Sequence, residues 1–137
     1  GVNPGAINIE EEERRFRQKV EAGAEFVLTQ PVFQEQLFFD FLERNKDFKI
    51  PVLIGILPLS SYKSAEFLHN EVPGMSIPEH IREKMRKAEI SNKAKETGIE
   101  IAREVLLKMK DFADGAYIMA PVGGVDTALK VIKDLIT

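Results

Sequence analysis

The sequence predicts an α/β fold built on about three parallel strands with flanking helices. Three short apolar runs, at 24–31, 50–58 and 115–119, have the length and composition of buried strands. Segments in which apolar residues recur at helical spacing lie before, between and after these runs. Strands that alternate with helices form parallel sheets, and the functional groups of such sheets gather at the carboxyl ends of the strands.

Composition and charge narrow the class of protein. At 137 residues, with 44% hydrophobic and 30% charged side chains, the chain has the size and composition of one globular domain. Its formal net charge of -3 gives no electrostatic reason to expect nucleic acid or an anionic membrane as a partner. The absence of cysteine excludes disulfides and thiolate metal ligands, and it fits a reducing compartment. Because no apolar run approaches the roughly 18 residues of a membrane span, we expect a cytoplasmic protein. We expect no metal site, because the chain has no cysteine and its two histidines belong to no recognisable set of metal ligands.

Residues 1–8 are predicted to form a loop, because they carry an Asn-Pro-Gly turn signal and no strand precedes them. Asn8 can cap the helix that follows, and Gly23 suits the end of that helix. We interpret the acidic run at 10–13 as a solvated first turn. The basic side chains after it are interpreted as a solvated face that pairs with these glutamates, with phosphate binding as the minority alternative; they are Arg14, Arg15, Arg17 and Lys19.

The strand at 24–31 ends in two polar residues. Its apolar run is typical of a strand that is buried on both faces. Thr29 and Gln30 would be costly to bury without hydrogen-bond partners. Their position at the carboxyl end of the strand therefore indicates that both face a cavity or a ligand.

Two further strand and helix units follow. A helix over 34–45 and the strand at 50–58 lead to a polar loop at 59–63, which lies on the same sheet edge as Gln30 and opens a short helix. The connection to the strand at 115–119 has room for two more helices, and a last helix ends the chain. The buried positions expected in these later helices are Ile81, Met85, Ile99, Ala102, Val105, Leu106, Met109, Leu129, Ile132 and Leu135, and both histidines, His69 and His80, are expected at the surface.

Three strands are fewer than a complete domain of this class needs. Strands in series with helices between them fit either half of a barrel or the edge of an open doubly wound sheet. Buried strands also need neighbours on both sides. We therefore expect residues 1–137 to be a single partial domain, the carboxyl-terminal portion of a (β/α)8 TIM barrel whose upstream strands are absent.

The motifs together resemble the methylenetetrahydrofolate reductase family, including the reductase half of bacterial proteins that join this activity to a homocysteine methyltransferase. The resemblance covers nearly the whole chain. It implies a (β/α)8 barrel that holds FAD at the carboxyl ends of its strands, with roughly the last three strands supplied here. The matching motifs are Asn3-Pro4-Gly5-Ala6, Lys19-Val20-Glu21-Ala22-Gly23-Ala24, Thr29-Gln30-Pro31, Gly55-Ile56-Leu57-Pro58-Leu59 and Tyr117-Ile118-Met119.

The resemblance also implies an activity. Members of the family convert 5,10-methylenetetrahydrofolate to 5-methyltetrahydrofolate, with NAD(P)H as the reductant and the flavin as the redox carrier. Their catalytic acid groups correspond to positions before residue 1, so we expect no catalytic residue in this chain and no activity from the chain alone. The expected partners are the folate substrate, the missing amino-terminal half of the barrel and further copies of the protein in a homo-oligomer.

The resemblance implies substrate-binding and cofactor-binding roles for individual residues. Gln30 would contact the folate pterin ring, since an amide both donates and accepts hydrogen bonds. Phe67, or Leu68 if the alignment gap falls differently, would stack near the folate, and Ser64 is the third predicted substrate-binding residue. The cofactor-binding residues, which would line the phosphate and adenosine end of FAD, are Asn3, Glu12, Arg15 and Lys19.

One position departs from the pattern of the family. Gly124 stands where many relatives carry an arginine. A contact to the benzoyl-glutamate part of folate would then be lost, or it would move to another residue such as Lys63.

Two alternatives remain open. A different pterin-binding or aldol-type barrel enzyme would also end its strands with polar groups, although none of the three predicted strands ends in the lysine that an aldolase needs. A non-catalytic half-barrel that assembles with itself would explain the length of the chain without any enzyme activity.

Overall fold

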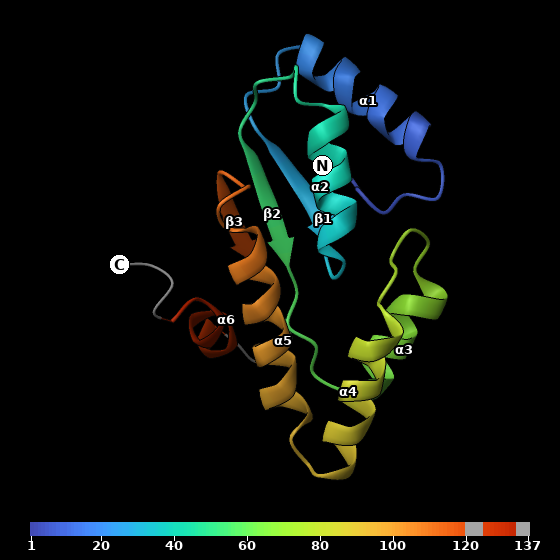
Figure 1. Ribbon diagram of the computed structural model, residues 1–137, viewed down its shortest axis with the longest axis vertical. Helices are drawn as coiled ribbons and strands as arrows, with labels where there is room; N and C mark the ends of the chain where they lie inside the picture. The colour runs from blue at the N-terminus through green and yellow to red at the C-terminus, as the bar shows by residue number, and fades with distance from the viewer. Residues whose placement is uncertain (120–124, 134–137) are drawn as a thin grey trace.

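The computed structural model describes residues 1–119 and 125–133, and it has three parallel strands with helices around them (Figure 1). The sheet order is β1-β2-β3, and both strand pairs are parallel, as predicted. Predictions that concern Gly124 and Leu135 lie outside the described residues. In chain order the elements are α1 (Ile9–Glu21), β1 (Val27–Pro31), α2 (Glu35–Arg44), β2 (Val52–Ile56), α3 (Tyr62–Glu71), α4 (Glu79–Ile90), α5 (Ala94–Met109), β3 (Gly115–Ile118) and α6 (Val125–Ile132).

Helices cover one face of the sheet. In Figure 1, α2 and α5 lie in front of the strands, and side chains from both helices pack with β2 in the largest core cluster. Phe38, Ile54 and Met109 in this cluster are fully buried. On β1, by contrast, Leu28 is 37% exposed, and Phe26 just before the strand is 56% exposed. The prediction that the first strand is buried on both faces is therefore wrong for the part of the chain that the structure describes.

The beginning of the chain pairs with β1. Val2 forms a parallel bridge with Thr29, its N–H donates to the Leu28 carbonyl at 2.9 Å, and its carbonyl accepts from the Gln30 N–H at 2.7 Å. Val2, which the sequence places in a loop, thus pairs with a strand, and it is almost fully buried. Because the bridge is parallel, Asn3 emerges at the same edge of the sheet as Gln30.

Thr29 joins β1 to β2 at an irregularity in the ladder. The register of the two strands shifts between Leu28 and Pro31. There the Gly55 N–H donates to the Thr29 hydroxyl at 2.9 Å, and the hydroxyl donates to the Gln30 carbonyl at 2.9 Å. Thr29 is 1% exposed, so the prediction that it faces a cavity is wrong, because successive strand side chains point to opposite faces.

The connection between β2 and β3 contains α3, α4 and α5, which form a second core cluster with the loop after β2. Ile81 and Met85 of α4 are buried as predicted. Helix α5 passes so close to the loop that a Cβ placed on Gly98 would lie 1.6 Å from the Leu59 carbonyl oxygen. Only glycine therefore fits at this position without moving the helix or the loop.

Two predictions about exposure in the later helices are wrong. Leu129, expected in the core, is 54% exposed, because α6 turns Thr127 and Val131 toward the core instead. His69, expected at the surface, is half-buried, and its Nδ1 accepts a hydrogen bond from the Ile77 N–H at 3.1 Å. His80 is exposed, as predicted.

Replacement of Thr29 tests the link between β1 and β2. Thr29→Val keeps the volume of the side chain but leaves the buried Gly55 N–H without its acceptor, so we expect a loss of about 1–3 kcal/mol in the free energy of unfolding. Thr29→Ser keeps the hydroxyl and removes one methyl group, which should cost about 1 kcal/mol or less. Urea denaturation of both variants measures the difference. Equal stability of the valine and serine variants would contradict the assignment.

Replacement of Gly98 tests the close approach of α5. We expect Gly98→Ala to lower the free energy of unfolding by about 3 kcal/mol, because the added methyl group meets backbone and not a movable side chain. Glu100→Ala, at an exposed position of the same helix, is the matched control and should change stability by less than about 0.5 kcal/mol. The contact is disproved if thermal melting gives the same midpoint for Gly98→Ala as for the control.

Candidate functional site

The carboxyl edge of the sheet is the candidate site. Figure 1 shows the arrowheads of β1 and β2 pointing toward the end of the molecule where α3 and α4 lie. Asn3 follows the bridged residue Val2 at this edge, Gln30 lies near the end of β1, and Leu57 follows β2 directly. The parallel topology therefore gathers residues that lie far apart in the sequence, which is the usual place for a site in β/α folds.

Gln30 is exposed on the open face of β1, on the same side as Leu28. Among the described residues its side chain has no hydrogen-bond partner, whereas its backbone N–H is bound by Val2. The amide is thus available at the edge where the sequence predicts a ligand.

Tyr117 of β3 closes the neighbouring part of this face. A Cβ on Gly55 would lie 2.8 Å from the Tyr117 hydroxyl oxygen, so the ring occupies the space that the glycine leaves free. The hydroxyl donates a hydrogen bond to the Thr29 carbonyl. Burial raises the pKa of Tyr117 above its ordinary value, so the phenol stays a neutral donor.

A hollow of about 450 Å³ lies beside the loop after β2. Three of the residues that sequence analysis proposed for folate line it: Ser64, Phe67 and the alternative Leu68. The Phe67 ring is 59% exposed. Ser64 and Ser61 form the capping box of α3, so the Ser64 hydroxyl also fixes the start of that helix. The remaining lining residues are Leu57, Pro58, Leu59, Ser60 and Lys95.

Lys95 also lines the hollow, but it was not among the binding residues predicted from the sequence. It belongs to the first turn of α5, far along the chain from α3, and it carries no local motif that marks it. The close approach of Gly98 to Leu59 brings it to the hollow. Lys63, the cation suggested from the sequence, is exposed on α3 but does not line the hollow.

The residues proposed for the flavin lie along one stripe of α1 and the segment beside it. Positions 12, 15 and 19 share one helix face. At its two ends the stripe touches the first residues of the chain, since the Glu12 carboxylate accepts from the Asn3 N–H and the Lys19 ammonium donates to the Gly1 carbonyl, both at 2.9 Å. The structure thus brings Asn3, Glu12 and Lys19 together, with Arg15 between the two ends of the stripe.

The two basic groups of this stripe differ in their partners. Arg15 is 62% exposed and lies 3.3 Å from Glu11, whose pKa is lowered to about 2, chiefly by the hydrogen bond from Arg14. Glu11 therefore stays ionised and is shared by both arginines. Lys19 is exposed and bonded to a neutral carbonyl. Because this partner carries no charge, the positive charge of Lys19 is not neutralised by it and can attract an anion.

Asn3 is held on three sides. Besides its N–H, which donates to Glu12, its Oδ1 accepts from the Gly5 N–H at 3.0 Å and its Nδ2 donates to the Gly74 carbonyl at 3.3 Å. Gly74 has a positive φ of 77° in the turn between α3 and α4. Asn3 therefore fixes the loop at the edge of the sheet to that turn.

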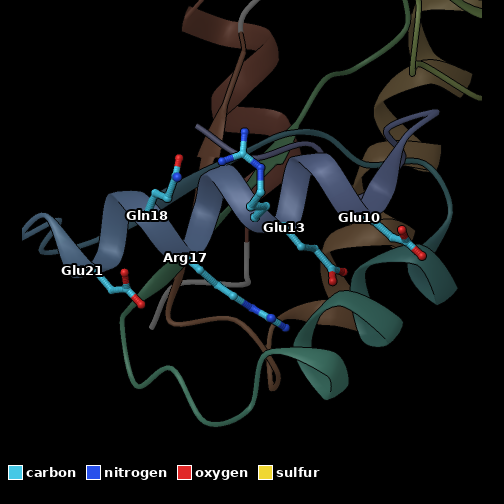
Figure 2. A pocket seen from close by; sticks show the side chains of 6 residues that line it. Glu10, Glu13, Arg17, Gln18 and Glu21 are labelled. Atoms are coloured by element: carbon cyan, nitrogen blue, oxygen red, sulfur yellow. The ribbon is translucent and has the colours of Figure 1, made fainter.

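A second hollow, shown in Figure 2, runs along another stripe of α1. In that view Glu13 and Arg17 point toward α2, whereas Gln18 points the opposite way, so the side chains do not converge. Glu13 is 8% exposed and pairs with Arg44 at 2.6 Å, and Arg17 lies over the Phe48 ring. The prediction of a solvated first turn is wrong for Glu13, and these charges serve helix packing.

The described ranges 1–119 and 125–133 contain neither a cluster of metal-ligating side chains nor a membrane-spanning helix. No group of three histidine, aspartate or glutamate side chains there is placed to hold a metal ion. No helix in the same ranges combines the length and apolar composition that crossing a bilayer requires.

Comparison with known proteins gives the family. Residues 1–118 match the methylenetetrahydrofolate reductase family. The chain is 30% identical over 105 residues to methylenetetrahydrofolate reductase 2 of Schizosaccharomyces pombe, an alignment that covers 72% of this chain and 16% of that protein. The chain therefore spans about one sixth of the length of this curated relative.

A solved structure supports the fold. An uncharacterized protein from Clostridium thermocellum that binds two copies of 5-methyl-5,6,7,8-tetrahydrofolic acid superimposes with a TM-score of 0.67 at 20% identity, over 92% of this chain and 48% of that one. The likeness confirms the predicted fold class, a three-stranded parallel portion of a TIM barrel with flanking helices. Since the family match extends over most of the sequence, the chain belongs to the methylenetetrahydrofolate reductase family.

Proposed function

We propose that the chain is the carboxyl-terminal part of a flavin-dependent reductase that converts 5,10-methylenetetrahydrofolate to 5-methyltetrahydrofolate with NAD(P)H. The observation that carries the proposal is the exposed amide of Gln30 at the carboxyl edge of a parallel sheet, in a chain of this family. A polar side chain that ends a β-strand of a barrel lies where barrel enzymes bind their substrates.

Folate is the proposed substrate of this edge. The Gln30 amide can donate to and accept from the edge of a pterin ring at the same time. The exposed ring of Phe67 can stack on a flat aromatic group, and Ser64 holds the helix that carries it. The Clostridium thermocellum protein of similar fold binds a methylated tetrahydrofolate, which supports a ligand of this chemistry.

The residues of α1 fit the phosphate end of FAD. Lys19 and Arg15 present two cations one turn apart, beside a loop that Asn3 fixes. The Glu12 carboxylate has one oxygen on the Asn3 N–H, and a carboxylate can also accept from ribose hydroxyls. When bound, the flavin would accept hydride equivalents from NAD(P)H and pass them to the folate. In this proposal the chain's own residues hold and orient the two ligands.

In the complete enzyme, the rest of the barrel would cover the open face of β1. The open face of β1, with Phe26 and Leu28 exposed, leaves one side of a bound ligand uncovered by the described part of this chain. We therefore expect the chain alone to be inactive. We also propose that the complete enzyme is cytoplasmic and a homo-oligomer. The same open face supports a second candidate, a non-catalytic half-barrel that pairs with another copy of itself.

Lys19 tests the flavin part of the proposal. In the complete reductase, Lys19→Ala should weaken FAD binding by about 1.5 kcal/mol, roughly tenfold in Kd, through loss of a charge-assisted phosphate contact. Folate affinity should not change. Lys46→Ala removes another exposed ammonium, which pairs with Glu43, and is the control. Flavin fluorescence titrations that give the same Kd for both variants would remove Lys19 from the site.

Gln30 tests the substrate part. In the complete reductase, Gln30→Glu removes a donor and adds a charge facing the pterin, so the folate half-reaction should lose about 1–3 kcal/mol of transition-state stabilisation. FAD content, melting temperature and flavin reduction by the nicotinamide should stay near those of the parent. Gln18→Glu, an exposed amide on α1, is the control for the added charge. A variant that loses flavin or melts early, yet turns over folate normally per bound flavin, would make Gln30 structural.

A further inference from the structure

The hollow beside the loop after β2 has one cation in an otherwise neutral lining. Five of its eight lining residues are apolar or aromatic, two are serines, and the last is Lys95. The Phe67 ring is the most exposed apolar surface among them. Such a lining suits a flat, uncharged body that ends in an anion.

The position of Lys95 is fixed by backbone packing. Lys95 lies one turn before Gly98 on α5, so the two residues share a helix face. That face meets the loop after β2, because no side chain separates Gly98 from Leu59. The ammonium is therefore carried on a rigid element that cannot move away from the hollow without breaking this contact.

Lys95 is also not committed to a carboxylate. It is exposed, and within the described ranges it takes part in no salt bridge, unlike Lys84 and Lys108 on α4 and α5, which pair with Glu104 and Glu35. The ammonium is thus open to a ligand, and a lysine offers a point charge that tolerates several carboxylate geometries.

We propose that Lys95 recognises the carboxylates of the glutamate tail of folate and so makes the site selective for folates over tail-less pterins. The inference rests on the proposed function, since it takes the folate to be the occupant of the hollow. The tetrahydrofolate named for the similar structure has a flat aminobenzoyl ring that ends in a glutamate with two carboxylates. Phe67 would stack on the ring, and Lys95 would bind the end of the tail.

Two ligands that differ only in the tail test the proposal. In the complete reductase, calorimetry measures the Kd of 5-methyltetrahydrofolate and of 5-methyltetrahydropteroate, which lacks the glutamate. We expect Lys95→Ala to weaken the first about tenfold and to leave the second unchanged. Lys95→Arg, which keeps the charge, should retain most of the preference. Lys93→Ala removes an exposed lysine at the start of the same helix that does not line the hollow, and it should change neither Kd.

The outcomes separate this inference from the function on which it rests. A parent protein that binds neither ligand overturns the proposed function, and the inference with it. If the parent binds both ligands and Lys95→Ala has no effect, or weakens both equally, the folate site stands and the role of Lys95 is refuted. A loss shared equally by Lys93→Ala would also refute it, because the effect would then be one of general charge.

Discussion

The hydroxyl of Thr29 holds β1 to β2 where the ladder between them loses its register. Without it the Gly55 N–H would be buried and unpaired, which costs more than an ordinary hydrogen bond contributes. The same interaction orients the end of β1. Because Thr29 points into the helix-covered face, its neighbour Gln30 must point to the open face. Tyr117 then bonds the Thr29 carbonyl from β3, so all three strands depend on this residue.

A second constraint positions the residues that line the hollow beside the loop after β2. Three helices connect β2 to β3, and a connection of that length could pack in many ways. The absence of a side chain on Gly98 lets α5 lie directly against the loop after β2. This contact brings the exposed ring of Phe67 on α3 and the side chain of Lys95 on α5 to one hollow. Backbone packing, and not sequence proximity, therefore assembles the chemistry there.

The elements were predictable wherever local pattern decides them. Apolar runs identified all three strands, and helical spacing identified Ile81 and Met85 as core. Prediction failed where a tertiary partner decides. The carboxylate of Glu13 is buried only because Arg44 meets it from another helix, and Lys95 reaches the hollow only through the packing of α5. The Asn-Pro-Gly turn signal placed Val2 in a loop, and no local pattern marks its bridge to Thr29, which lies 27 positions later in the sequence.

The proposed function requires that the carboxyl edge at Gln30 and the hollow at Phe67 form one folate site. The most direct measurement is a crystal structure of the complete reductase with 5-methyltetrahydrofolate bound. We expect the pterin edge within hydrogen-bond distance of the Gln30 amide and the aminobenzoyl ring against Phe67. A folate bound elsewhere in the barrel, with the Gln30 amide still free, would contradict it.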